Sequence, residues 1–160
     1  MDAFLNLPPQ IVTLILAMLP VTELRLSIPF ALEILHLPVW EAFFWSIIGD
    51  MVSAVIIVYT MQPITRWLRR HWPWADRMLA RVFIKTRGRF DSRYSKLGKV
   101  ALIVFVAIPL PGTGAWSGSM AAWLFGIEKK ESIVYIFLGV ILSGILVTLI
   151  SLGFVQLFNL

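Results

Sequence analysis

Three ionisable residues lie in parts of the sequence that are otherwise apolar. Residues 19–30 read LPVTELRLSIPF and place Glu23 and Arg25 between two prolines, and Asp50 stands near the middle of a long apolar run. A charged side chain at the centre of a bilayer costs at least about 2.5 kcal/mol unless it is paired or hydrated. These three residues are therefore the first candidates for a functional site.

Carboxyl groups at such depth can exchange protons. A low-dielectric site favours the neutral form of a carboxyl group, so Asp50, and Glu23 when it is not paired, are candidate proton-coupling residues. Two structural interpretations stay open beside this one. Glu23 and Arg25 can neutralise each other and only fix the local fold, and Asp50 can be a packing residue that is protonated or paired with Arg25.

A second polar break, residues 109–119, reads PLPGTGAWSGS. A helix that begins inside the membrane directs free N–H groups and a partial positive charge at its tip, which favours an anion. Thr113 and Ser117 add hydroxyl donors, and Gly114 allows a backbone or ligand to approach closely. We expect these three residues to join the site of Glu23, Arg25 and Asp50. Alternatively, Gly114 and Gly118 form only a small-residue packing notch for the other broken segment.

The composition is that of an integral membrane protein. The chain has 160 residues, of which 59% are hydrophobic and 14% are charged, and its mean hydropathy is +0.84. It contains no cysteine and two separated histidines, which excludes thiolate chemistry and the usual zinc motifs. We find no nucleophile with a base partner, so we predict no enzyme activity, no catalytic residues, no metal and no cofactor.

The apolar segments predict an all-α membrane fold. Residues 40–60 and 133–158 are long enough to span a bilayer, which takes about 20 apolar residues. Two other regions are shorter and broken: 11–19 and 26–37 flank a break at 20–25, and 100–108 and 120–127 flank the break at 109–119. We interpret each as a re-entrant hairpin of two half-helices. The alternative for the first is one kinked helix over 11–35.

The two halves share a pattern. Pro20 aligns with Pro109, 89 positions later, and Gly49 aligns with Gly139, 90 positions later. We therefore predict a single membrane domain over 1–160, with hairpin-plus-helix repeats at 11–60 and 98–158 and a linker at 61–97. Of 14 Lys and Arg residues, 11 lie between Arg66 and Lys99. Positive charge marks the cytoplasmic side, which puts the linker inside, both termini outside, and the second repeat inverted.

The linker carries a basic amphipathic pattern. Its sequence WADRMLARVFIKTRGRF predicts a helix that lies in the cytoplasmic interface against anionic lipid headgroups, with apolar and basic residues on separate faces. The apolar face has Met78, Leu79, Val82 and Phe83, and the basic face has Arg77, Arg81 and Lys85. Because the topology accounts for this charge, we expect no nucleic-acid partner.

PVTELRLSIPFAL and FVAIPLPGTGAWSGSMAAWLFGI resemble the corresponding motifs of the small multidrug export family. That family is similar in architecture to the DedA or VTT membrane proteins, which pair two re-entrant hairpins with spanning helices and include proton-dependent transporters and translocases of lipid carriers. The resemblance implies that Glu23 takes the place of the DedA acid in the first hairpin. The DedA second hairpin has arginines thought to meet phosphate, whereas this chain has Gly114 near that place, and Arg25 offers the charge from the opposite hairpin.

These observations predict a transporter of the inner (plasma) membrane. Its substrate, a small molecule or a lipid, would bind between the hairpin tips, with protons exchanged at Glu23 and Asp50. Because two spans enclose little interior, we expect a homodimer surrounded by membrane lipids. The alternatives are a DedA-like translocase of a lipid or lipid-phosphate headgroup and, from another class, a non-transporting membrane assembly factor.

Overall fold

In the computed structural model, which describes residues 7–72, 74, 77, 94–110 and 112–158, the chain is helical and these residues include no strand. The described helices, in chain order, are α2 (Pro9–Met18), α3 (Glu23–Glu33), α4 (Val39–His71), α6 (Tyr94–Ala107), α7 (Ala115–Phe125) and α8 (Lys129–Phe158). The expected all-α class is confirmed at this level. The predicted amphipathic helix around residues 78–85 lies outside the described residues.

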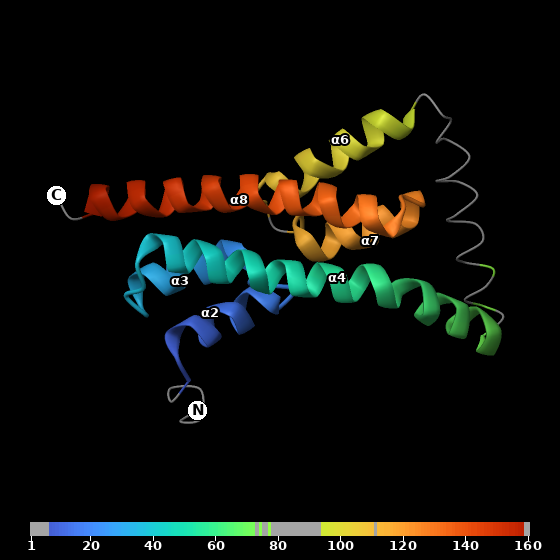
Figure 1. Cartoon of the computed structure of the whole chain (residues 1–160), viewed down its shortest axis with the longest axis horizontal. Coiled ribbons are helices and arrows are strands. Elements are labelled where there is room, and N and C mark those ends of the chain that lie inside the picture. The colour runs from blue at the N-terminus through green and yellow to red at the C-terminus, as the bar shows by residue number, and fades with distance from the viewer. Residues whose placement is uncertain (1–6, 73, 75–76, 78–93, 111, 159–160) are drawn as a thin grey trace.

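Two of these helices, α4 and residues Lys129–Gly153 of α8, are long and apolar enough to cross a membrane. They lie side by side and run in opposite directions (Figure 1). Phe43 near the start of α4 meets Gly144 of α8, and the Lys129 ammonium lies 5.0 Å from the centre of the Tyr59 ring. The two spans expected from the sequence are confirmed as helices, but α4 continues past Thr60 to His71.

The chain reverses direction between α2 and α3. Near the start of α2, Gln10 donates to Glu41 near the start of α4. At the end of α2, the carbonyl of Met18 accepts from Ser53, further along α4, so the two helices run parallel. Along α3 the order is inverted. Leu24, near the start of α3, donates its backbone N–H to Asp50, whereas Ser27, one turn later, donates to Ser46, which comes before Asp50 in α4. A single kinked helix over 11–35 is therefore not the structure of this region.

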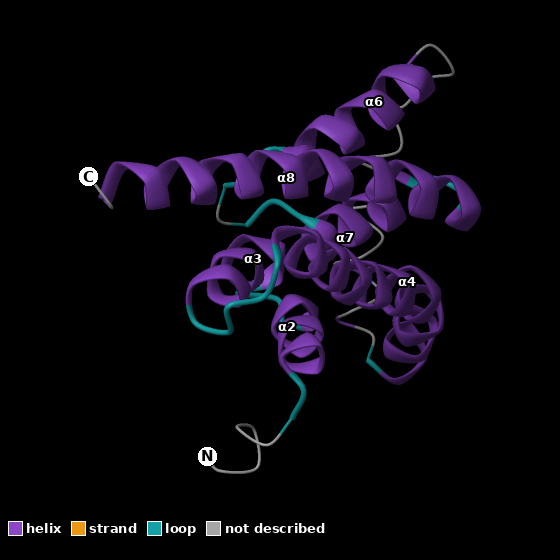
Figure 2. Ribbon diagram, turned by 60° about the vertical axis from the view of Figure 1, so that its left-hand side comes forward, coloured by secondary structure: helices purple, strands orange, loops and turns teal. Residues whose placement is uncertain are grey.

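A second pair of short helices, α6 and α7, contacts α8, with α6 above α8 and α7 below it in Figure 2. Lys99 pairs with Glu131, and Val106 packs against Gly139, so α6 runs parallel to α8. The α7 helix then leads back to the start of α8 and ends at Gly126, whose φ of 73° is the left-handed conformation that glycine favours at a helix end.

Each short pair also contacts the long helix of the other half, because α3 packs on α8 and α7 packs on α4. The core between the helices combines apolar side chains with buried serines. Ser27 donates to Ser46 at 2.7 Å, and Ser119 donates to the carbonyl of Ala115 at 2.6 Å. Small polar residues of this kind let membrane helices approach closely while their hydroxyls stay hydrogen-bonded.

The boundaries of both breaks differ from the sequence-based expectation. The first break was expected at 20–25, but α3 already begins at Glu23, so Glu23 and Arg25 lie in its first turn. The second was expected at 109–119, but α7 begins at Ala115 and includes Ser117. In both cases Gly, Ser or charged residues enter a helical turn because tertiary contacts outweigh their weak helix propensity.

Candidate functional site

The carboxyl group of Glu23 lies at the N-terminal end of α7. The backbone N–H of Trp116 donates to Glu23 Oε1 at 3.2 Å, and the Glu23 side chain is only 6% exposed. The first N–H groups of a helix have no partner within it and carry partial positive charge. Glu23 therefore fills, from the other half of the chain, the place where the sequence predicted an anion.

The backbone of Glu23 is strained in this position. Its φ is +46°, in the left-handed region that L residues other than glycine rarely adopt. Such a conformation costs about 1–2 kcal/mol and persists only where surrounding contacts hold it. The contact with α7 and the ion pair with Arg25 are the contacts that hold Glu23.

Gly114 gives Glu23 the room that it occupies. A Cβ atom built on Gly114 would come within 2.7 Å of Glu23 Cδ and 2.8 Å of Oε1. Gly114 also has φ +141°, another conformation that L side chains rarely adopt. Gly114 was expected to let another group approach closely, and that group is the Glu23 side chain.

Arg25 connects the start of α3 to the loop before α7. Its Nη2 donates to Thr113 Oγ1 at 2.9 Å and lies 3.6 Å from Glu23 Oε2, and its Nη1 donates to the carbonyl of Leu110. Thr113 Oγ1 in turn donates to the carbonyl of Ile108 at 2.6 Å. The planar guanidinium suits this branched set of acceptors, which a lysine ammonium would not match.

Asp50 lies in the first half of α4. It is 1% exposed, it interacts electrostatically with both Glu23 and Arg25, and the Leu24 backbone N–H is its hydrogen-bond partner. Its Oδ1 is buried and has no hydrogen-bond partner among the described residues. An unpaired buried carboxylate oxygen is energetically costly.

The structure adds two residues that the sequence analysis did not include in the site. The Trp116 indole N–H donates to the carbonyl of Met18 at 3.0 Å, and Ser53 Oγ donates to the same carbonyl at 2.9 Å. This ties the end of α2 to the start of α7. The position of Trp116 inside the glycine-rich break was the available signal, because buried indoles usually pair their N–H.

Ser117 is the predicted site residue with the weakest connection to the others. Its hydroxyl contacts the carbonyl of Gly114 at 3.4 Å, a local contact within the first turn of α7. The other five predicted residues, Glu23, Arg25, Asp50, Thr113 and Gly114, come together at the junction of the two halves. A Cβ built on Gly118 would meet Val106 and Ile136, which belong to the same half of the chain as Gly118.

Two open grooves lie elsewhere. The first, of about 390 Å³, lies beside α2 and α3, and the second, of about 460 Å³, lies between the start of α4 and the later part of α8. Their linings include none of the predicted site residues. At the junction itself, groups of the two halves contact each other directly, because Glu23 Oε1 accepts from the Trp116 backbone N–H and Arg25 Nη2 donates to Thr113 Oγ1.

Comparison with known proteins gives one family. Residues 23–146 match the sequence model of the family described as "Putative small multi-drug export protein". The matched region contains Glu23, Arg25, Asp50, Thr113 and Gly114. No curated protein and no solved structure matches the chain.

Proposed function

Because the chain belongs to the small multi-drug export family, and its two long apolar helices indicate a membrane protein, we propose that it is a proton-coupled exporter. Glu23 and Asp50 exchange the protons, and substrate binds between the tips of the two helix pairs. The observation that carries this proposal is the Glu23 carboxyl group held against α7 beside the unpaired Asp50 Oδ1.

The helix pairs are, in this proposal, re-entrant hairpins of an inverted repeat. Equivalent contacts support it. In the first half, Gln10 donates to Glu41. In the second half, Lys99, which is 89 residues after Gln10, donates to Glu131, which is 90 residues after Glu41.

The glycines of the long helices repeat this correspondence. A Cβ on Gly49 would meet Ala17 Cβ at 2.6 Å, and a Cβ on Gly139 would meet Val106 Cβ at 2.6 Å, again at matched positions. Each of these glycines lets the first short helix of a pair pack closely on the long helix that follows it. The shared contacts give the weak sequence pattern a three-dimensional counterpart.

The depth of the site fits a transport role. Asp50 is nine residues after Glu41 and nine before Tyr59, which is about 14 Å of helix in each direction. A hydrocarbon layer is about 30 Å thick, so Asp50 would lie near the bilayer midplane when Glu41 and Tyr59 lie near its two surfaces. The junction of the helix pairs then coincides with the place where inverted-repeat transporters bind substrate.

Protonation provides the switch. The Glu23 carboxylate is attracted by the Trp116 N–H, the start of α7 and the Arg25 guanidinium. A proton on Glu23 removes that charge and weakens all three attractions, which lets the tips separate. Asp50 is close enough to Glu23 to interact with it electrostatically and takes the proton in turn. Substrate enters between the separated tips, and the return of the charge on Glu23 closes them.

Positive charge supports an orientation. The last turn of α4 has Arg69 and Arg70, and α8 begins with Lys129 and Lys130, at the same end of the antiparallel long helices. We place this end in the cytoplasm and the protein in the inner membrane, with both termini outside. The protein works as a homodimer among membrane lipids, which cross-linking in native membranes would test.

The experiment uses purified protein in liposomes that carry a pH gradient. Ethidium movement and internal pH are followed together for the wild type, Glu23→Gln, Asp50→Asn and the control Glu128→Gln, which changes an exposed acid in the loop between α7 and α8. We expect gradient-driven ethidium flux in the wild type and the control, and at least a tenfold loss in the two site variants.

Equal ethidium and proton fluxes in all four proteins would refute the coupling role of Glu23 and Asp50. A wild type that moves neither ethidium nor protons would favour a second function, translocation of a lipid. One observation favours that second candidate, because the groove beside α2 and α3 has apolar walls and is open to the surroundings. Fluorescent-lipid scrambling in the same liposomes measures it.

A further inference from the structure

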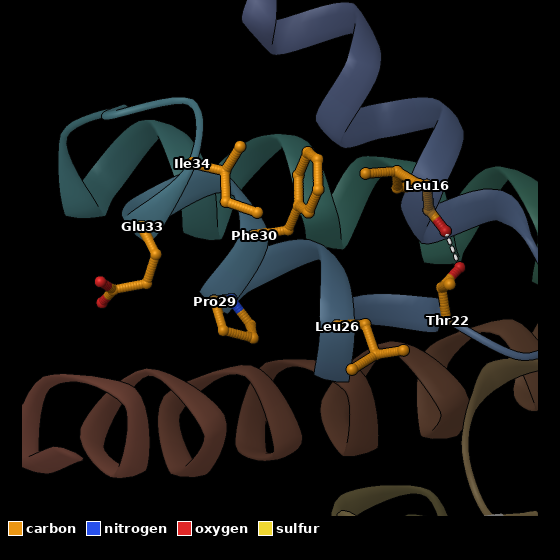
Figure 3. A pocket seen from close by; sticks show the side chains of 7 residues that line it. All are labelled: Leu16, Thr22, Leu26, Pro29, Phe30, Glu33 and Ile34. Atoms are coloured by element: carbon orange, nitrogen blue, oxygen red, sulfur yellow. Dashed lines mark hydrogen bonds between the residues drawn. The ribbon is translucent and has the colours of Figure 1, made fainter. Parts of the chain in front are cut away.

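The C-terminal segment of α4, residues 61–71, exposes positive charge and aromatic rings together. This sets it apart from the groove beside α2 and α3, whose walls are almost entirely apolar and where the Glu33 carboxyl group points away from the cavity (Figure 3). In the segment, the stretch RWLRR places Arg66, Arg69 and Arg70 close together, and all three are exposed. The segment therefore has a charge that a binding partner must match.

The positive charge needs an anion from outside the helix. Arg66 and Arg70 are four residues apart, so their Cβ atoms are neighbours on the helix surface, about 5–6 Å apart, and like charges at this spacing repel. The sequence has no acid between Asp50 and Asp76 that would offset them. A helix C-terminus attracts cations, but only over its last turn, and Arg66 precedes that turn. A bound anion would relieve the repulsion.

Aromatic and apolar side chains lie on another face of the segment. Trp67 is 56% exposed, and the centre of its ring lies 4.7 Å from that of His71 and 6.4 Å from that of Trp72. Ile64, one turn before Trp67, is 52% exposed. The positions 64, 67 and 71 follow the spacing of one helical face, away from that of Arg66. Exposed indoles beside positive charge are typical of the membrane–water interface.

The length of α4 places this segment at the membrane surface. The Lys129 ammonium lies 5.0 Å from the centre of the Tyr59 ring, and tyrosine and lysine are both typical of that surface. From Tyr59 to His71 the helix measures about 18 Å, whereas the headgroup layer is only about 5–7 Å thick. Pro63 has no N–H for the carbonyl of Tyr59, which favours a bend, and the green end of α4 turns away from α8 (Figure 1). The bend keeps the segment near the headgroups.

We propose that the C-terminal segment of α4 is a docking site for anionic phospholipids of the adjoining leaflet. Arg66 and Arg70 bind the headgroup phosphate, which a planar guanidinium matches with paired hydrogen bonds, and Ile64 and Trp67 insert beside the acyl chains. A zwitterionic headgroup offsets the arginine charge less, because it carries its own cation. A nucleic acid would match the charge but offers no apolar layer to Ile64. This inference goes beyond the proposed function and does not depend on transport.

The test is lipid selection by the full chain in phosphatidylcholine liposomes, measured with spin-labelled phosphatidylglycerol and spin-labelled phosphatidylcholine. The wild type is compared with the double variant Arg66→Gln/Arg70→Gln. The matched control, Lys129→Gln/Lys130→Gln, removes two positive charges from the same end of the long helices. Unfolding temperature verifies that each variant is folded.

We expect the wild type to bind phosphatidylglycerol about fivefold more strongly than phosphatidylcholine, the ratio that corresponds to about 1 kcal/mol for a basic residue near an anionic surface. The arginine variant should lose at least about threefold of this preference, and the lysine variant less than about twofold. Salt at about 0.5 M should remove most of the preference of the wild type, because it screens the charges.

The depth of the two faces is measured separately. Because the chain contains no cysteine, Trp67→Cys and Arg69→Cys each give one site for a nitroxide label. The label at Trp67 should be relaxed more by lipid-soluble oxygen than by a water-soluble nickel complex. The label at Arg69, on the basic face, should show the reverse.

Three results would overturn the proposal. The first is a wild type without preference for phosphatidylglycerol, and the second is an equal loss in the arginine and lysine variants, which would leave only a general positive charge at this end. The third is a label at Trp67 that meets the nickel complex more than oxygen, which would assign the aromatic face to water or to a protein partner. Failure of the proposed function changes none of these results, because lipid selection is measured without substrate or gradient.

Discussion

Glu23 and Gly114 belong to opposite halves of the chain and form one interlocked contact: the Glu23 carboxyl group occupies the space where any side chain at position 114 would begin. The contact joins the first turn of α3 to Gly114, the N-cap residue directly before α7. It holds together the tips of the two helix pairs, so the residues around it contribute to the stability of the junction.

Gly114→Ala is expected to destabilise the protein strongly. The new Cβ would collide with Glu23 and would adopt an unfavourable φ, and overpacking of this kind costs about 1–3 kcal/mol beyond the backbone strain. Gly112→Ala is the matched control, because Gly112 also has a positive φ, +86°, but no atom of the described residues lies within 4 Å of a Cβ built on it. Thermal unfolding in detergent measures the difference, and equal effects of the two variants would argue against the interlock.

Gly49→Ala and Gly139→Ala should destabilise the protein by similar amounts, about 1–3 kcal/mol each, because each Cβ would enter the helix packed against it. In the part of the chain that the structure describes, no atom lies within 4 Å of a Cβ built on Gly153, in the later part of α8. Gly153→Ala should therefore be neutral or slightly stabilising through helix propensity. Denaturation of the three variants under the same conditions compares them. A neutral result at Gly49 or Gly139 alone would contradict the matched contacts of the two halves.

Arg25 and Thr113 should be energetically coupled. Arg25→Gln and Thr113→Val each break the link between α3 and the loop before α7, so the double variant should lose less than the sum of the two, by about 0.5–3 kcal/mol. Arg25→Lys should rescue little, since an ammonium cannot reach the carbonyl of Leu110, Thr113 and Glu23 together. Additive losses in unfolding free energy would mean that the hydrogen bond seen between these residues contributes nothing.

The Lys99–Glu131 pair predicts a pH dependence of stability. Its hydrogen bond raises the pKa of Lys99 above the ordinary 10.5. Because the folded pKa exceeds the unfolded one, the pair stabilises the fold below that ordinary value, and the contribution is lost as pH rises through the higher folded pKa. The unfolding temperatures of wild type and Lys99→Gln should therefore differ slightly at neutral pH and converge in strong base.

The equivalent pair in the first half is the control for this prediction. Gln10 and Glu41 form the same contact at 2.8 Å, but Gln10 does not titrate, so the effect of Gln10→Leu should not change over the same alkaline range. Tyr135, whose ring lies 6.0 Å from the Lys99 ammonium, is present in every protein compared. A Lys99→Gln effect that persists in strong base would show that the lysine acts by packing alone.

The sequence alone determined the class of this protein and the identity of its unusual residues. Hydrophobic runs of spanning length lead to the long helices α4 and α8, and proline and glycine in otherwise apolar segments lead to short broken helices, since both are consequences of local composition. Charge at membrane depth is equally visible, because Glu23, Arg25 and Asp50 are costly wherever the fold places them.

Only the tertiary structure decided what these residues meet. Glu23 and Trp116 are 93 positions apart, and nothing in either segment specifies that the carboxyl group of one fills the helix end of the other. The starts of α3 at Glu23 and of α7 at Ala115 also depend on tertiary contacts, because local sequence predicts that both residues lie inside breaks. Local propensity favours a break there, but Glu23 at the N–H groups of α7 and Arg25 across to Thr113 stabilise the first helical turns from a distance.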